Sequence, residues 1–281
     1  MGVGAVLAAW GLDPVPTAGI GLAALAYLAA WWRLSRAGVG WPAGRAALFG
    51  AGLLALVVAV DGPPDALAEE SFSMHMAQHL LIMMVAAPLL VLAGPVWLVL
   101  RADPRWLPRS VLAPVVRSRP ARVLTHPLLA FGLLAMVLVL SHLSGFYEAA
   151  LESPRVHEAE HIAYLAAAVL FWSTTIGSEP IGRPLSAPAR MFLLLLMMPV
   201  MALLGLAIAE ADQLLYPYYG DNPPPWGATP MADQHLAGTL MWTVGMIIMP
   251  VPLAVLLRRW FDEDERAHAR LTARQFRDAA S

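Results

Sequence analysis

Two pairs of histidines, each spaced by one turn of a helix, are the most informative residues of this sequence. His75 and His79 form the first pair, and His157 and His161 form the second. Residues four apart share one face of an α-helix, so each pair could bind a single metal ion. Both pairs begin long apolar runs, and ionisable side chains inside membrane segments are costly and therefore mark functional sites. The pattern predicts a metal site within a membrane.

The composition is that of a polytopic membrane protein. Of the 281 residues, 59% are hydrophobic and 14% are charged, whereas about a quarter of a soluble domain is charged. The apolar runs reach the length of about 20 residues that a helix needs to cross a bilayer. There is no cysteine, which excludes disulfides and thiolate metal sites. We therefore expect an all-α fold embedded in the lipid bilayer.

We expect a bundle of seven transmembrane helices over residues 1–260, followed by a charged cytoplasmic tail over residues 261–281. The third apolar run is too long for one straight crossing, and Pro88 and the Gly94–Pro95 step should kink it or end it early. The expected spans cover approximately residues 17–34, 41–60, 71–100, 126–146, 157–177, 188–210 and 231–260.

The arginines predict the orientation of the bundle. Every basic residue is an arginine, and all of them except Arg155 fall in the first, third and fifth connections or in the tail. Basic residues concentrate on the cytoplasmic side of membrane proteins. The N-terminus is therefore expected outside and the C-terminus in the cytoplasm.

In this topology most of the histidines gather at the outer ends of the spans, whereas His126 and His268 lie on the inner side. Imidazole binds copper and zinc well; copper heads the divalent affinity series, and methionine thioethers suit Cu(I). Copper is therefore the preferred ion and zinc the alternative. The expected ligands are His75, His79, His142, His157 and His161. Further ligands, or side chains that orient the ligands, are expected among Met74, Met76, Gln78, Glu160, Asp233, Gln234 and His235.

Two other kinds of site fit the same histidines. The stretch from His157 to His161 matches the H-E-x-x-H motif of zinc peptidases, with Glu158 as the general base. A non-covalent haem held by two histidines of facing helices is another interpretation. The methionine pairs Met83–Met84 and Met197–Met198 fit either simple packing or a route for a soft metal ion.

Taken together, these residues resemble the multi-span CtaG-type cytochrome c oxidase assembly factors. The resemblance implies seven spans, a bacterial inner membrane and a role in maturing the copper centre of the oxidase. It runs over residues 70–245 and rests on residues 75–81, 87–90, 94–95, 126–127, 142, 160–161, 171–172, 233–238 and 241–242.

We accordingly expect an assembly factor rather than an enzyme. It would bind copper at the outward-facing His/Met site and support delivery to the catalytic subunit of a haem-copper oxidase, with periplasmic copper chaperones as further partners and no nucleic acid. The alternatives are a copper permease and an intramembrane zinc metalloprotease. The copper hypothesis predicts that the rings of His79, His142 and His161 converge at the outer end of the bundle.

Overall fold

The structure is a computed structural model that describes residues 4, 8–143, 145–177, 179–181 and 185–280. Within that part of the chain every regular element is helical. The long elements are α2 (Pro14–Arg36), α3 (Ala43–Val60), α10 (Pro127–Leu143), α12 (Pro154–Ile176), α13 (Ala187–Ala209), α15 (Pro230–Ile248) and α16 (Pro250–Ala280). The predicted third span is built from α5 (Phe72–Leu80), the π-helix η1 (Leu81–Ala86), α6 (Ala87–Ala93) and α7 (Pro95–Ala102). The short connecting helices are α4 (Pro63–Ala66), α8 (Arg109–Val116), α9 (Arg119–Leu124), α11 (Phe146–Glu152) and α14 (Tyr218–Asp221).

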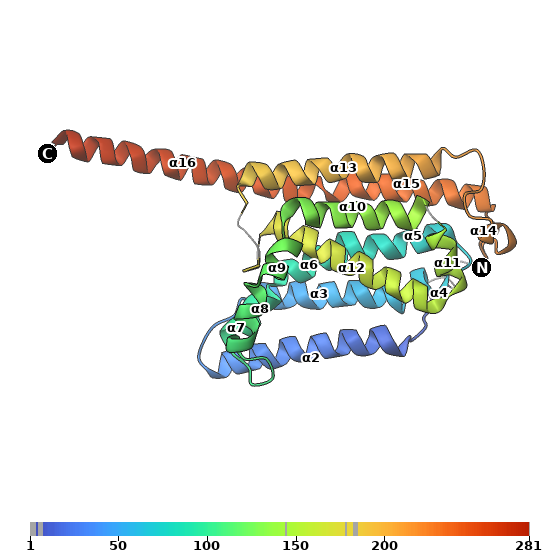
Figure 1. The fold of residues 1–281 in the computed structure, drawn as a ribbon, viewed down its shortest axis with the longest axis horizontal. Helices are drawn as coiled ribbons and strands as arrows, with labels where there is room; N and C mark the ends of the chain where they lie inside the picture. The colour runs from blue at the N-terminus through green and yellow to red at the C-terminus, as the bar shows by residue number, and fades with distance from the viewer. Residues whose placement is uncertain (1–3, 5–7, 144, 178, 182–184, 281) are drawn as a thin grey trace.

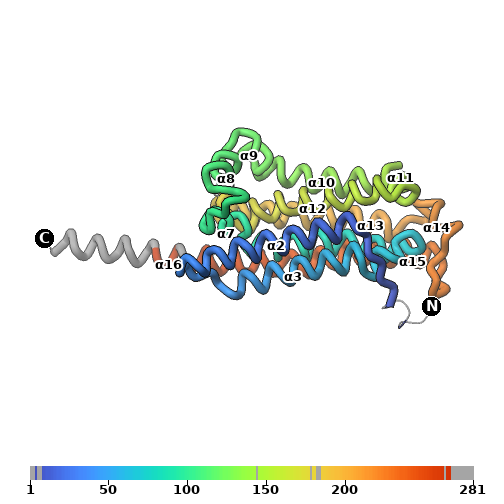
Figure 2. Tube along the Cα trace, turned by 90° about the horizontal axis from the view of Figure 1, so that it is seen from below, coloured from blue at the N-terminus to red at the C-terminus, as the bar shows by residue number. Residues whose placement is uncertain are grey.

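The long helices run side by side along one axis (Figure 1). The N-terminus lies at the same end of the bundle as α4, α11 and α14, and α7, α8 and α9 lie at the opposite end. The C-terminal helix α16 continues well beyond the bundle on the α7 side (Figure 1). The turned view shows α2 and α3 side by side (Figure 2). The predicted boundary between bundle and tail, after Trp260, falls inside α16, and that domain division stays a prediction.

Five helical segments in the described residues are long and apolar enough to cross a membrane, and a sixth is present if the bent pair α10 and α11 counts as one span. These five segments are Pro14–Arg36, Ala43–Ala66, Phe72–Ala102, Ala187–Ala209 and Pro230–Arg266. The predicted count of seven also includes α12. This helix matches α2 and α13 in length but carries Arg155, Glu158 and Glu160 in its first two turns. The protein is thus a multi-span helical bundle, and the count of seven remains a prediction.

The two breaks predicted in the third run are both present. Gly94 adopts a left-handed conformation with φ of 68°, which ends α6 and begins α7, and glycine takes this conformation at little cost. Around Pro88 the helix widens into the π-helix η1, in which the Ala87 N–H donates to the Ile82 carbonyl. Proline has no N–H and its ring crowds the preceding turn, so it disturbs the α-helical bonding before it. The third run is therefore one bent path rather than one straight helix.

The apolar core lies among η1, α6, α10, α12, α13 and α15, and α2 packs against the outside of the bundle. Met83, Met84 and Met197 are buried in this core, and Met198 packs against it, as the packing interpretation of the methionine pairs expects. A smaller cluster joins α2 to α3, where Tyr27 stacks on Phe49 with ring centroids 3.9 Å apart.

The helices α13 and α15 cross backbone to backbone in the core. A Cβ on Gly238 would lie 2.5 Å from the Ala209 nitrogen and from the Gly205 carbonyl oxygen. A Cβ on Gly205 would in turn lie 2.8 Å from the Gly238 carbonyl oxygen. Glycines allow membrane helices to approach backbone to backbone. These two glycines therefore set the position of α15, which contacts α5 at the candidate site.

Candidate metal centre

The histidine pairs meet at the end of the bundle that carries the N-terminus, where α5, α10 and α12 come together. The start of α5 is held by α15. The Asp233 carboxylate accepts hydrogen bonds from the Ser71 and Ser73 hydroxyls and from the Ser73 N–H. Ser71 is the N-cap of α5, and its hydroxyl accepts from the Met74 N–H. Such caps fix where a helix begins. Asp233 therefore sets the register in which α5 presents its histidines.

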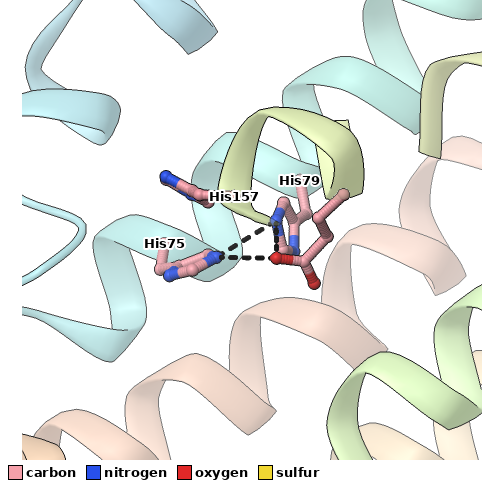
Figure 3. A group of neighbouring side chains, drawn as sticks. His75, His79 and His157 are labelled. Carbon is pink, nitrogen blue, oxygen red and sulfur yellow. Dashed lines mark hydrogen bonds and ion pairs between the residues drawn. The ribbon is translucent and has the colours of Figure 1, made fainter. Parts of the chain in front are cut away.

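Four side chains form what we call the buried group: His75, His79, His157 and Glu160. Their potential ligand atoms all lie within 4.8 Å of one another. The Nε2 atoms of His75 and His79 are 3.1 Å apart (Figure 3), and the Glu160 Oε2 lies 3.8 Å from each of them. The His157 ring lies beside that of His75, with centroids 4.7 Å apart. This donor set of three imidazoles and one carboxylate could hold a metal ion.

Contacts with tyrosines determine how the His75 ring presents its nitrogens. The Tyr219 hydroxyl donates to the Ala68 carbonyl at 2.9 Å, so its oxygen can accept from the His75 Nδ1, which lies 3.4 Å away. If Nδ1 carries the proton, the His75 Nε2 has a free lone pair facing His79 and Glu160. Hydrogen bonds of this kind select the tautomer of metal-binding histidines.

The buried group contains polar atoms without hydrogen-bond partners. His75 and His79 are fully buried, and Glu160 is 1% exposed. Neither carboxylate oxygen of Glu160 has a hydrogen-bond partner, and neither does the His79 Nδ1. A carboxylate out of water is costly unless a cation or hydrogen-bond donors satisfy it. The group thus has the electrostatic character of a cation site.

A second set of ligand atoms adjoins the first, and we call it the rim group: Asp65, His157 and His161. Its members are half-buried, and their potential ligand atoms also lie within 4.8 Å of one another. The Asp65 Oδ1 accepts a hydrogen bond of 2.6 Å from the Gln78 side chain, which also donates to the Ala59 carbonyl. The two groups share His157. Asp65 was missed by the sequence analysis because α4 carries no metal-ligand spacing.

His142 lies beside both groups but belongs to neither. Its Nδ1 donates to the Leu138 carbonyl at 2.9 Å, and its buried Nε2 has no hydrogen-bond partner. The His79 ring centroid is 6.3 Å from that of His142 and 5.7 Å from that of His161. The rings of His142 and His161 thus both lie close to that of His79, as predicted, and whether the three form one metal site at the outer end stays a prediction.

The other residues expected near the metal have different surroundings. His235 is exposed on α15, and Met76 is buried in the apolar core. Gln234 bonds the Leu215 N–H and the Gln213 carbonyl, and Met74 is half-buried outside both groups. Asp233 and Gln234 thus hold backbone segments near the site, and Gln78 holds the Asp65 carboxylate.

Several tyrosines around the buried group were missed as well. The Tyr164 ring lies tilted beside that of His79 with centroids 4.3 Å apart, and the Tyr147 ring centroid lies 4.8 Å from that of His75. Tyr164 is four residues after Glu160, a helical spacing that could have linked it to the site. Tyr147 and Tyr219 come from connections outside the long helices, where no periodicity identifies them.

The family model for the cytochrome c oxidase caa3 assembly factor, Caa3_CtaG, matches residues 25–263. The chain belongs to this family. All the members of both groups lie inside the matched region, and the resemblance seen in the sequence is confirmed.

Relatives of this chain occur in mycobacteria. Uncharacterized proteins of Mycobacterium bovis and Mycobacterium tuberculosis are each 31% identical to it over 272 residues, which cover 94% of this chain and 41% of theirs. An uncharacterized protein of Mycobacterium leprae is 29% identical over 268 residues, covering 93% of this chain and 41% of the relative. The chain therefore spans about two fifths of the length of these relatives. No solved structure matches it.

Proposed function

We propose that this protein is a cytochrome c oxidase assembly factor that carries copper as its cargo. The buried group would bind the ion, and the catalytic subunit of a haem-copper oxidase would receive it, with periplasmic copper chaperones as donors. The observation that carries the proposal is Glu160, a buried carboxylate with no hydrogen bond that lies 3.8 Å from two imidazole nitrogens. The membership in the Caa3_CtaG family supports the link to the oxidase.

The proposed setting is a bacterial inner membrane, crossed seven times, with the N-terminus outside and the C-terminus in the cytoplasm. The helices α7, α8 and α9 carry many arginines and lie opposite the end with the N-terminus. Basic connections stay in the cytoplasm. Both groups would then face the outer compartment, from which copper arrives.

Copper is preferred to zinc because imidazole sites bind copper more tightly in the divalent series. Transfer needs only ligand substitution between helices, so no catalytic residue is proposed. The zinc protease alternative would use Glu158 as the base that activates water, so substitution of Glu158 distinguishes it from copper binding. The copper permease alternative needs a polar route through the bundle, whereas Met83, Met84 and Met197 lie in a closely packed apolar core.

The test is copper binding by the purified chain in detergent, measured as metal per chain after loading with Cu(II) and, separately, after anaerobic loading with Cu(I). The wild type should hold copper, and His79→Ala should lose most of it because its ring lies at the centre of the buried group. His126→Ala and His235→Ala are matched controls because both residues are exposed. Copper retained at the wild-type level by His79→Ala, with native helical content, would contradict the proposal. An equal loss in all three variants would contradict it too.

A further inference from the structure

The rim group opens on a groove between α2 and α12, whereas the buried group is enclosed. The groove has a volume of about 860 Å³, and its walls are largely apolar side chains of α2, α3, α6 and α12. At one end it is lined by Asp65, His157 and His161 together with the acidic residues Asp13, Glu69 and Glu158. A mouth lined by one sign of charge concentrates ions of the opposite sign. A cation entering along this groove would meet the rim group first.

The two groups are built so that an ion can pass between them. They share His157, and each contributes one carboxylate, Asp65 in the rim group and Glu160 in the buried group. An ion that moves from the rim group to the buried group therefore exchanges the Asp65 carboxylate for that of Glu160. It also exchanges the His161 imidazole for those of His75 and His79. The charge of its ligands and its oxidation state both stay the same. The buried Nε2 atoms of His157 and His161 have no hydrogen-bond partner, so both are free to act as ligands.

We infer that the rim group is the entry site for copper, and that the ion passes to the buried group while His157 stays bound. Asp65 and His161 would be released as His75, His79 and Glu160 bind. This inference rests on the proposed copper function and adds the route of loading. A hydrolytic zinc centre at the rim group, with Glu158 as the base, would use the same three ligands. It would leave unexplained why an adjoining buried set of ligands shares one of its histidines.

The experiment compares the rate and the equilibrium of copper loading. Cu(I) is presented anaerobically to the full chain in detergent as its cationic acetonitrile complex, and bicinchoninate added at set times captures the copper that is not yet bound. The absorbance of the captured copper gives both quantities. Asp65→Asn should slow loading about tenfold, because charged residues at a site raise association rates 10- to 1000-fold. It should leave the copper bound per chain at equilibrium unchanged. The substitution is nearly isosteric, and the asparagine oxygen can still accept the hydrogen bond from Gln78.

Two further variants make the test specific. Glu70→Gln removes an exposed carboxylate that lines neither the groove nor either group, so it should load at a rate close to that of the wild type. Glu160→Gln should instead weaken the equilibrium affinity. If Asp65→Asn loads as fast as the wild type while Glu160→Gln weakens binding, the entry site is wrong and the copper function stands. If the wild type binds no copper, the copper function itself fails.

The hydrolytic interpretation has its own outcome. Glu158→Gln should hold the wild-type amount of copper at equilibrium and should support oxidase activity in cells, because Glu158 belongs to neither group of ligand atoms. If Glu158→Gln abolishes oxidase activity while the copper bound at equilibrium stays at the wild-type level, the rim group acts as a hydrolytic centre and the inference is overturned. Wild-type chains that hold two copper ions at once would overturn it as well, because the shared His157 implies one ion in transit.

Discussion

The indole N–H of Trp172 donates to the carbonyl of Met83 at 2.8 Å, across the interface between α12 and η1. In the π-helical pattern the next N–H for this carbonyl would come from Pro88, which has none. Trp172 therefore satisfies a buried acceptor that the proline leaves open. It also ties the helix that carries His157 and His161 to the segment directly after His79.

We predict that Trp172→Phe lowers the free energy of unfolding by about 1–3 kcal/mol, the usual result of leaving a buried acceptor unsatisfied. The measurement is thermal or denaturant unfolding of the purified chain in detergent. Trp106→Phe is the matched control, since Trp106 is 53% exposed. Equal stability of the two variants would show that the carbonyl of Met83 does not depend on the indole.

Substitutions of Glu160 and of Glu158 should have different effects on copper affinity and on oxidase activity. We predict that Glu160→Gln lowers copper affinity and reduces oxidase activity in cells, because the ion would lose its carboxylate in the buried group. Glu158→Gln should leave both nearly unchanged, because Glu158 belongs to neither group of ligand atoms. Both variants are measured at matched expression, and the reverse order of effects would favour the protease alternative.

Tyr219 should act through the orientation of His75. We predict that Tyr219→Phe weakens copper binding by about tenfold, within the 10- to 100-fold range for groups that hold metal-ligating histidines. Tyr218→Phe is the control on the neighbouring residue, which is half-buried and makes no hydrogen bond with His75. Copper affinity measured by chelator competition distinguishes them. Unchanged affinity in Tyr219→Phe would exclude the hydroxyl from this role.

The helix crossing at Gly238 should tolerate no larger side chain. We predict that Gly238→Val destabilises the bundle by at least about 1–3 kcal/mol, the usual result of overpacking a close contact. Gly132→Val is a control in another long helix, because a Cβ there meets nothing within 4 Å. The comparison uses thermal unfolding in detergent. Equal losses of stability in the two variants would point to β-branching rather than to the crossing.

Glu179 should make stability depend on pH. Its carboxylate accepts the N–H groups of Val96 and Trp97 at the start of α7, at 3.1 and 3.2 Å. Burial nevertheless raises the pKa of this carboxyl to about 7, from an ordinary value of 4.5. Between these values the folded chain keeps a proton that the unfolded chain has lost. The contribution of Glu179 is therefore largest below pH 4.5, and it falls as the pH rises to about 7.

We predict that the unfolding temperature of Glu179→Gln falls less over this pH range than that of the wild type. The substitution can reduce the pH dependence of the free energy of unfolding by up to about 1.4 kcal/mol per pH unit, the value for one proton. The glutamine oxygen can still accept from the α7 N–H groups, so the variant should fold. Glu152→Gln, on an exposed residue, should keep the wild-type slope. Parallel pH profiles for the wild type and Glu179→Gln would disprove the assignment.

Much of this protein could be predicted from local features of the sequence. The helical spacing of His75 with His79 and of His157 with His161 is a property of single helices. The break at Gly94–Pro95 follows from backbone chemistry in the same way. Apolar run lengths likewise indicated a multi-span bundle. Such features depend on neighbours within one or two turns, so they can be inferred without knowing how helices pack.

Only the tertiary structure decided which side chains complete the site. Asp65 joins the rim group from the short helix α4, and Tyr219 reaches His75 from a connection 144 residues away in sequence. His235 shares a helix with Asp233 but is exposed, because α15 turns its other face toward α5. These outcomes depend on the bend at Pro88, on the glycine crossing of α13 with α15 and on the rotation of each helix about its axis. Contacts between distant segments set all three, and no local spacing encodes them.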